Sequence, residues 1–151
     1  MDPSLSGTET ALVIAHFAAT WFLVGLIWMV QRVTYPAFRH AAGDGREYHR
    51  HHTNGIGPIV GPPMAIEAVT AVGLLVPGVP GVPTWLALVG LALLGIVTAS
   101  TIFLQVPAHG RLSDGMERAE IDRIVRTNWV RTIGWSLRGV VAIAVLVTAG
   151  V

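Results

Sequence analysis

The chain has 151 residues, of which 52% are hydrophobic and 13% charged, and its formal net charge is +1. Soluble domains carry about 25% charged residues, so this composition indicates a membrane protein. Cysteine is absent, which excludes disulfides, thiolate metal sites and a cysteine nucleophile, and no nucleic-acid-binding motif is visible. We therefore expect the lipid bilayer, and no nucleic acid, as a partner.

Four long apolar runs follow one another along the chain, at about 11–30, 58–79, 84–106 and 129–151. Each is close to the ~20 residues that a helix needs to cross ~30 Å of hydrocarbon. In lipid, backbone groups must be satisfied within the segment, which favours helices. The sequence predicts an all-α, polytopic four-helix membrane bundle, with residues 1–151 forming a single domain.

The arginines set the predicted orientation, because the chain has no lysine. Apart from Arg131, at the start of the fourth run, and Arg138 within it, they fall between the first and second runs and between the third and fourth runs, whereas the N-terminus and the 77–83 turn have none. By the positive-inside rule, both long loops lie in the cytoplasm and both termini lie outside it. No positive residue precedes the first run, so we expect no cleaved signal peptide and a protein of the inner membrane.

Short helices are predicted in both cytoplasmic loops. Asp44-Gly45-Arg46-Glu47 and Asp114-Gly115-Met116-Glu117 each fit an N-cap acid followed by glutamate at N3. The first predicted helix covers about 45–53, and the second, 115–127, could run directly into the fourth span. The glycines and prolines of the 77–83 turn predict a tight hairpin between spans two and three.

A weak internal similarity links the two halves of the chain. Gln31 and Gln105 end spans one and three, and each is followed by a Pro-Ala pair, Pro36-Ala37 or Pro107-Ala108. This pattern indicates either a tandem repeat of helical hairpins or a coincidence. The glycines in the spans would allow close helix contact and also the formation of a homodimer.

Two charged residues fall deep within predicted spans. Glu67 and Arg138 each lie nine residues into their spans, ~14 Å from the cytoplasmic side. We expect them to form an ion pair, because an unpaired charge at this depth is costly. The alternatives are a snorkelling Arg138 and a protonated Glu67.

Other polar residues recur at helical spacing in the cytoplasmic half of each span. Gln31 and Tyr35 are four residues apart, and Arg131 precedes Trp135 by four. Such stripes predict a polar pocket shared by the four helices, although they also fit inter-helix hydrogen bonds that only hold the bundle together. Tyr35, Glu67, Arg131 and Arg138 are therefore the candidate catalytic residues.

Histidines suggest a metal site at the same side of the membrane. His49 and His52 have the i, i+3 spacing of a helical ligand pair, and His109 follows span three. With Glu67 as an oxygen ligand or base, they would suit iron, zinc or manganese. The alternative is a set of surface or headgroup-facing histidines. His16 lies at the opposite side without a histidine partner, which disfavours a bis-histidine haem and leaves two alternatives, a five-coordinate haem or a hydrogen bond within the bundle.

Three segments carry a family resemblance: Val30-Gln31-Arg32-Val33-Thr34-Tyr35-Pro36, Val106-Pro107-Ala108-His109-Gly110-Arg111-Leu112 and Asn128-Trp129-Val130-Arg131. Together they resemble small four-helix bacterial membrane proteins of the anthrone oxygenase-like group, and the resemblance covers most of the chain. It implies a four-span bundle and, for some members, oxygenation of aromatic polyketides. The histidine cluster of Tyr48–Thr53 departs from that pattern.

The sequence thus leads to two functional hypotheses. In the first, the protein is a membrane-embedded, metal-dependent oxidoreductase for a lipophilic small molecule, in which Arg131 and Arg138 orient an anionic oxygen. In the second, it is a non-enzymatic carrier or a subunit that binds a lipid or a larger complex.

Overall fold

The computed structural model describes residues 5–41 and 45–151, and this part of the chain is almost entirely helical. It contains four helical segments of 31–34 residues: Gly7–His40, Arg46–Gly78, Thr84–Asp114 and Arg118–Ala149. All four are long and apolar enough to cross a membrane. The predicted all-α four-helix bundle is confirmed. Helices of this length are about 50 Å long, so each segment extends well beyond ~30 Å of hydrocarbon.

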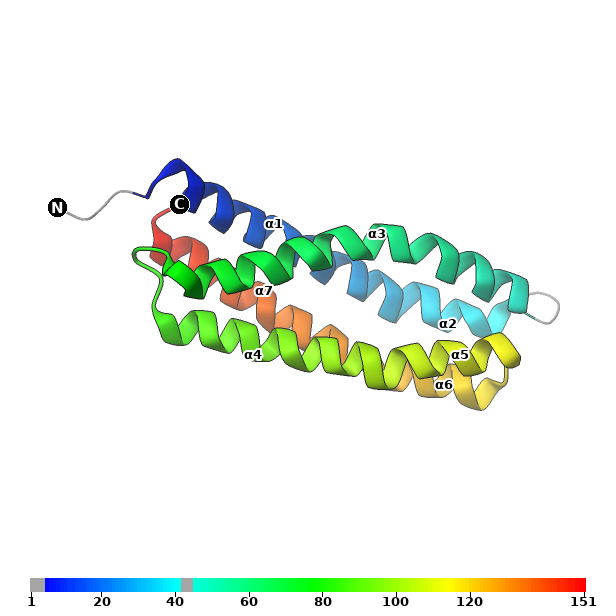
Figure 1. Ribbon diagram of the computed structural model, residues 1–151. Helices are drawn as coiled ribbons and strands as arrows, with labels where there is room; N and C mark the ends of the chain where they lie inside the picture. Colours follow the sequence, from blue (N-terminus) through cyan, green and yellow to red (C-terminus); the bar gives the residue numbers. More distant parts are fainter. Residues whose placement is uncertain (1–4, 42–44) are drawn as a thin grey trace.

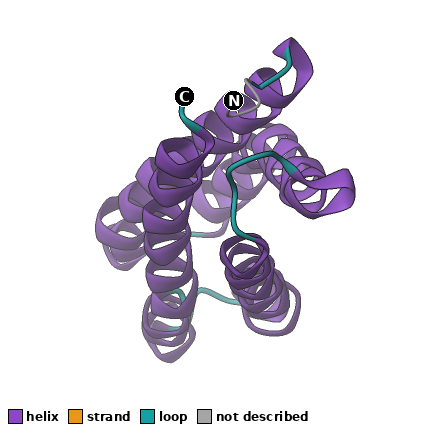
Figure 2. Ribbon diagram, turned by 90° about the vertical axis from the view of Figure 1, so that its left-hand side faces the viewer, coloured by secondary structure: helices purple, strands orange, loops and turns teal. Residues whose placement is uncertain are grey.

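The segments run alternately up and down the bundle (Figure 1). The start of the first segment, the end of the fourth and the 79–83 turn lie at one end, called here the terminal end. The opposite end carries the end of the first segment, the start of the second and the 115–117 connection, and is called the histidine end. Figure 2, turned by 90°, shows helices joined by short loops, and no strand occurs in residues 5–41 and 45–151.

The first and third segments share the same irregularity. In the first, α1 (Gly7–Met29) passes into a π-helical turn, η1 (Val30–Thr34), and then into α2 (Tyr35–Ala37) and the 3₁₀ turn η2 (Phe38–His40). In the third, α4 (Thr84–Ser100) passes into the π-helical turn η4 (Thr101–Gln105) and then into α5 (Val106–Asp114). A proline is the second residue of the helix that follows each π turn. Because proline lacks the N–H of a regular ladder, it is a physical reason for a local change of register.

The second and fourth segments absorb the predicted loop helices. Residues 45–53 form no separate helix but the first part of α3 (Arg46–Gly73), which passes into η3 (Leu74–Gly78). As predicted, the second loop helix, α6 (Arg118–Thr127), leads almost directly into α7 (Trp129–Ala149).

The predicted capping boxes fare differently. The one before α6 is wrong. Asp114 is the last residue of α5, and Glu117 is the N-cap of α6. The chain stays helical through Asp114 because α5 buries Ala108 and Leu112 against the bundle. The other predicted cap, Asp44, lies outside the described residues, but the N-cap of α3 is Gly45, so Glu47 is the second residue of the helix and not the predicted third.

Two apolar clusters fill the bundle at different heights. One lies toward the histidine end and includes Leu23, Val97 and Trp135, while the other lies toward the terminal end and includes Val13 and Val145. Buried polar residues at intermediate positions along α1 and α7 separate them. The bundle therefore contains a polar layer within its apolar core.

Candidate functional site

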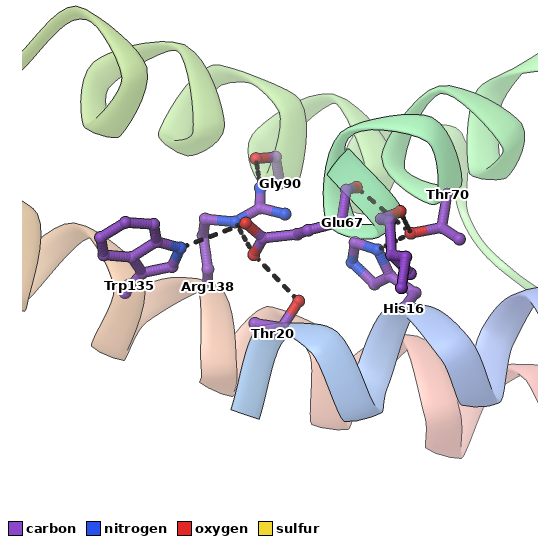
Figure 3. Close-up of polar contacts among 8 residues, drawn as sticks. His16, Thr20, Glu67, Thr70, Gly90, Trp135 and Arg138 are labelled. Atoms are coloured by element: carbon purple, nitrogen blue, oxygen red, sulfur yellow. Dashed lines mark hydrogen bonds and ion pairs between the residues drawn. The ribbon is translucent and has the colours of Figure 1, made fainter. Parts of the chain in front are cut away.

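The polar layer is centred on a buried ion pair (Figure 3). Arg138 Nε lies 2.7 Å from Glu67 Oε1, with side-chain exposures of 1% and 0%. The carboxylate also accepts hydrogen bonds from Thr20 Oγ1 at 3.0 Å and Trp135 Nε1 at 3.1 Å. Arg138 Nη1 donates to the Gly90 carbonyl. The predicted Glu67–Arg138 pair is confirmed, and it joins all four segments through α1, α3, α4 and α7.

His16 completes this layer on the side toward the terminal end. Its Nδ1 lies 2.9 Å from Thr70 Oγ1, one turn along α3 from Glu67. His16 is therefore hydrogen-bonded within the bundle, the alternative to haem ligation that its position allowed.

A second set of polar residues holds η1 against the fourth segment. Gln31 Nε2 donates to the Val125 carbonyl at 3.1 Å, and Gln31 Oε1 accepts from Asn128 Nδ2 at 2.9 Å and from Thr132 Oγ1 at 3.3 Å. These side chains are bonded to one another, and Asn128 Oδ1 has no partner among the described residues. Here the polar stripes are inter-helix hydrogen bonds rather than a pocket.

The histidines that the sequence predicted to be close do meet at the histidine end. His49 Nε2 lies 2.9 Å from His109 Nδ1, and His109 Nε2 lies 2.9 Å from the Tyr35 hydroxyl. The imidazole of His52 stacks on His109 with ring centroids 6.0 Å apart. His49 is buried and His52 is partly exposed, whereas His51 and His40 point to the surface. The structure thus selects His49 and His52 as the inward-facing pair.

Glu67 is not part of this histidine cluster. It follows His49 by eighteen positions on the continuous helix α3, which places the two about 27 Å apart along the axis. Both of its carboxylate oxygens are already bonded within the polar layer. Among the described residues, no group of three histidine or acidic side chains is placed to hold a metal ion.

A cavity of about 320 Å³ lies between the polar layer around Glu67 and the histidine cluster. Its wall is mainly apolar and includes Leu23, Ile27 and Val30. Polar groups gather on the remaining wall, which is formed by Tyr35, His52, Thr101, Gln105, His109, Arg131 and Trp135. A mostly apolar cavity with a few convergent polar groups is typical of a small-molecule site.

Among the described residues, Arg131 is the only charged one in the cavity wall. Its guanidinium lies over the Trp135 ring, 5.3 Å from the centroid, and beside the Tyr35 hydroxyl. Arg131 is 9% exposed, and no ion pair joins it to a carboxylate within residues 5–41 and 45–151. Arg131 therefore differs from Arg138, whose charge is balanced by Glu67.

Two buried polar atoms of the cavity-lining residues have no hydrogen-bond partner in the described part of the chain: Arg131 Nε and Gln105 Oε1. Burying an unpaired polar group usually costs about 1–3 kcal/mol. Both atoms belong to side chains that reach the cavity from different segments, η4 and α7. Unpaired groups of this kind are available to a bound molecule.

His49 connects the histidine cluster to a second, polar depression. That depression lies at the histidine end and is lined by residues such as Arg50, Thr53, Asn54 and Ser113, together with His49. His109 and Tyr35, by contrast, line the apolar cavity. Two hydrogen bonds through His109 therefore link the cavity wall to the polar depression.

Some cavity residues had no role in the sequence interpretation. Gly57 and Gly61 of α3 line the cavity four positions apart, with Ile56 and Val60 beside them. Their i, i+4 spacing places both glycines on one face of the helix. Two residues without side chains on one face indicate space beside that helix, and this was the available sequence signal for the cavity.

No protein-family model matches the chain, and no match was found among curated proteins or solved structures.

Proposed function

We propose that the chain is a multi-pass inner-membrane protein that binds a lipophilic small molecule in the cavity and exchanges a proton with it. In this proposal the histidine end faces the cytoplasm, since the arginine-bearing loops lie there and both termini lie at the opposite end. The apolar wall holds the body of the molecule. Tyr35 and Arg131 then face its polar oxygen.

The observation that carries the proposal is the hydrogen-bonded chain Tyr35–His109–His49, with both distances at 2.9 Å. With the proton of His109 on Nδ1, Tyr35 donates to His109 Nε2 and His109 Nδ1 donates to His49 Nε2. A hydroxyl of the ligand can then give its proton to Tyr35 as Tyr35 passes its own to His109. The same shift moves the Nδ1 proton of His109 to His49, at the polar depression. General acid–base catalysis requires this kind of positioned, hydrogen-bonded acceptor.

The guanidinium of Arg131 supports the same step. A ligand that loses a proton leaves an oxyanion, and a buried cation without a carboxylate partner stabilises such a charge strongly in a medium of low dielectric constant. The charge of Arg138 is already balanced, so it has a structural role in this proposal.

The test uses 2-naphthol, a lipophilic hydroxy compound whose excited state releases its proton only to a nearby acceptor. The untagged protein in nanodiscs should bind 2-naphthol and yield emission from the naphtholate form. Tyr35→Phe and His109→Gln should retain binding but emit from the neutral form. His51→Gln, on the exposed side of α3, is the matched control. 2-Methoxynaphthalene, which has no proton to give, reports binding alone.

The outcomes separate the two classes of function. Naphtholate emission that disappears in Tyr35→Phe supports a proton-transferring enzyme. Binding with only neutral emission in the wild-type protein would instead favour the carrier hypothesis. Absence of binding by either compound would refute the proposal.

A metal-dependent oxidoreductase is the second candidate, favoured by the direct approach of His49 Nε2 and His109 Nδ1. At a metal–nitrogen distance of about 2.1 Å, two tetrahedral ligands stand about 3.4 Å apart, so small ring movements would admit iron, zinc or manganese. His52 is the nearest further ligand. The resemblance to the anthrone oxygenase-like group belongs to this candidate.

Elemental analysis of untagged protein tests the metal. Near-stoichiometric metal that is lost in His49→Ala/His109→Ala, but kept in His51→Ala, would establish this candidate. A protein that stays metal-free after metal is added back would exclude it.

A further inference from the structure

The cavity opens sideways, between α3 and the start of α5. Three of its wall residues are exposed: Gly57, Gly61 and Val106. The same stretches of chain also carry large, apolar and exposed side chains, with Ile59 at 51% and Phe103 at 73%. In a membrane such surfaces face acyl chains, so the opening leads to lipid rather than to water.

The two glycines create this opening. An added Cβ at Gly57 or Gly61 would meet no atom within 4 Å. Close helix packing therefore does not require glycine at these two positions. Instead, the lack of a side chain there leaves space at the mouth of the cavity.

The polar groups of the cavity lie toward the histidine end, and its apolar wall extends inward. Arg131 precedes Trp135 by one helical turn, and Leu23 and Ile27 of α1 lie on the inner side. A molecule that fits this gradient carries a polar head near the membrane surface and an apolar body toward the centre. The buried, uncompensated charge of Arg131 selects an anionic head.

We propose that the ligand is a single-chain amphiphile with one acidic oxygen group, drawn from the surrounding bilayer through the opening at Gly57 and Gly61. Its acidic head pairs with Arg131, whose Nε has no other hydrogen-bond partner, and its chain lies along the apolar wall. This inference rests on the proposed function, because it names the substrate class and the entry route of the same cavity.

The experiment measures quenching of Trp135 fluorescence by brominated amphiphiles in nanodiscs. The variant Trp21→Phe/Trp28→Phe/Trp85→Phe/Trp129→Phe leaves Trp135, in the cavity wall, as the single tryptophan. At equal amounts per lipid, 11-bromoundecanoic acid should quench at least about tenfold more effectively than 11-bromoundecanol, because charge-assisted hydrogen bonds are the stronger ones. Arg131→Gln should remove the difference between acid and alcohol.

The entry route is tested by filling the mouth. Gly61→Phe should lower quenching by the acid severalfold. Gly55→Phe is the matched control, since Gly55 is exposed on the same helix, has free space around it and does not line the cavity. Both changes alter helix propensity equally, so a difference between them reports the mouth.

Three results would overturn the inference: equal quenching by acid and alcohol, equal effects of Gly61→Phe and Gly55→Phe, or quenching by a dibrominated phosphatidylcholine as effective as by the acid. The last result would assign the cavity to bulk lipid. Should the tryptophan-depleted protein fail to fold, competition of undecanoic acid against undecanol for 2-naphthol in the wild-type protein gives the same comparison. If 2-naphthol binds normally while the acid shows no preference, the proposed function stands and only this inference fails.

Discussion

Replacing Arg138 by methionine should be among the most destabilising single changes in the bundle. Arg138 and Glu67 are almost completely buried, and their Nε and Oε1 atoms are 2.7 Å apart. The change would leave the Glu67 carboxylate with two neutral donors, Thr20 and Trp135, but without its cation. Removing one partner of a buried pair typically costs about 3–5 kcal/mol.

The double variant Glu67→Gln/Arg138→Met sharpens this prediction. It removes both charges, so it should lose less stability than Arg138→Met alone, and the double-mutant cycle should show a strong coupling. Reversible unfolding in mixed detergent micelles, followed by circular dichroism, gives the free energies of unfolding. The reasoning is refuted if Arg138→Met unfolds like the wild-type protein, or if the losses of the two single variants simply add.

Three other changes probe different parts of the structure. Arg131→Met removes a buried charge that no carboxylate balances, so the free energy of unfolding in the same assay should stay equal or rise while binding of acidic amphiphiles weakens. Gly134→Ala should lower the free energy of unfolding by about 1–3 kcal/mol, because the new Cβ would lie 2.6 Å from the Cγ2 atom of Val97 and force α4 and α7 apart. Gly25→Ala is the control, and with open space around Gly25 it should be neutral or slightly stabilising. Gly45→Ala should cost about 1–2 kcal/mol in a thermal unfolding comparison with wild type, because Gly45 caps α3 at a φ of 70°.

The helices and the ion pair followed from simple properties of the sequence. Run length fixed the number of spans, and counting at 1.5 Å per residue placed Glu67 and Arg138 at one depth. Because an unpaired charge at that depth is costly, equal depth was enough to predict that the two residues form a contact.

Contacts that depend on helix continuity were harder to predict. Treating 45–53 as a separate helix allowed Glu67 to approach His49, whereas the unbroken α3 separates them. Helix α3 also passes through prolines at 58, 62 and 63, although proline usually kinks or ends a helix. The sequence also did not show which polar residues line the cavity and which form inter-helix hydrogen bonds. Spacing shows which residues share a face of a helix but not which neighbouring helix that face meets.

The position of the histidine cluster depends on the π-helical turns η1 and η4 as well as on the residue types. Each π turn holds one residue more than an α-helical ladder would, and each residue of a helix turns the chain by about 100°. Tyr35 directly follows η1, and His109 lies one turn beyond η4. Deleting a single residue from either turn would leave both side chains present but rotate one of them out of the other's reach. Related bundles should therefore be compared by the number of residues between the apolar run and its proline, since one insertion or deletion can assemble or dismantle the Tyr35–His109 contact without any substitution.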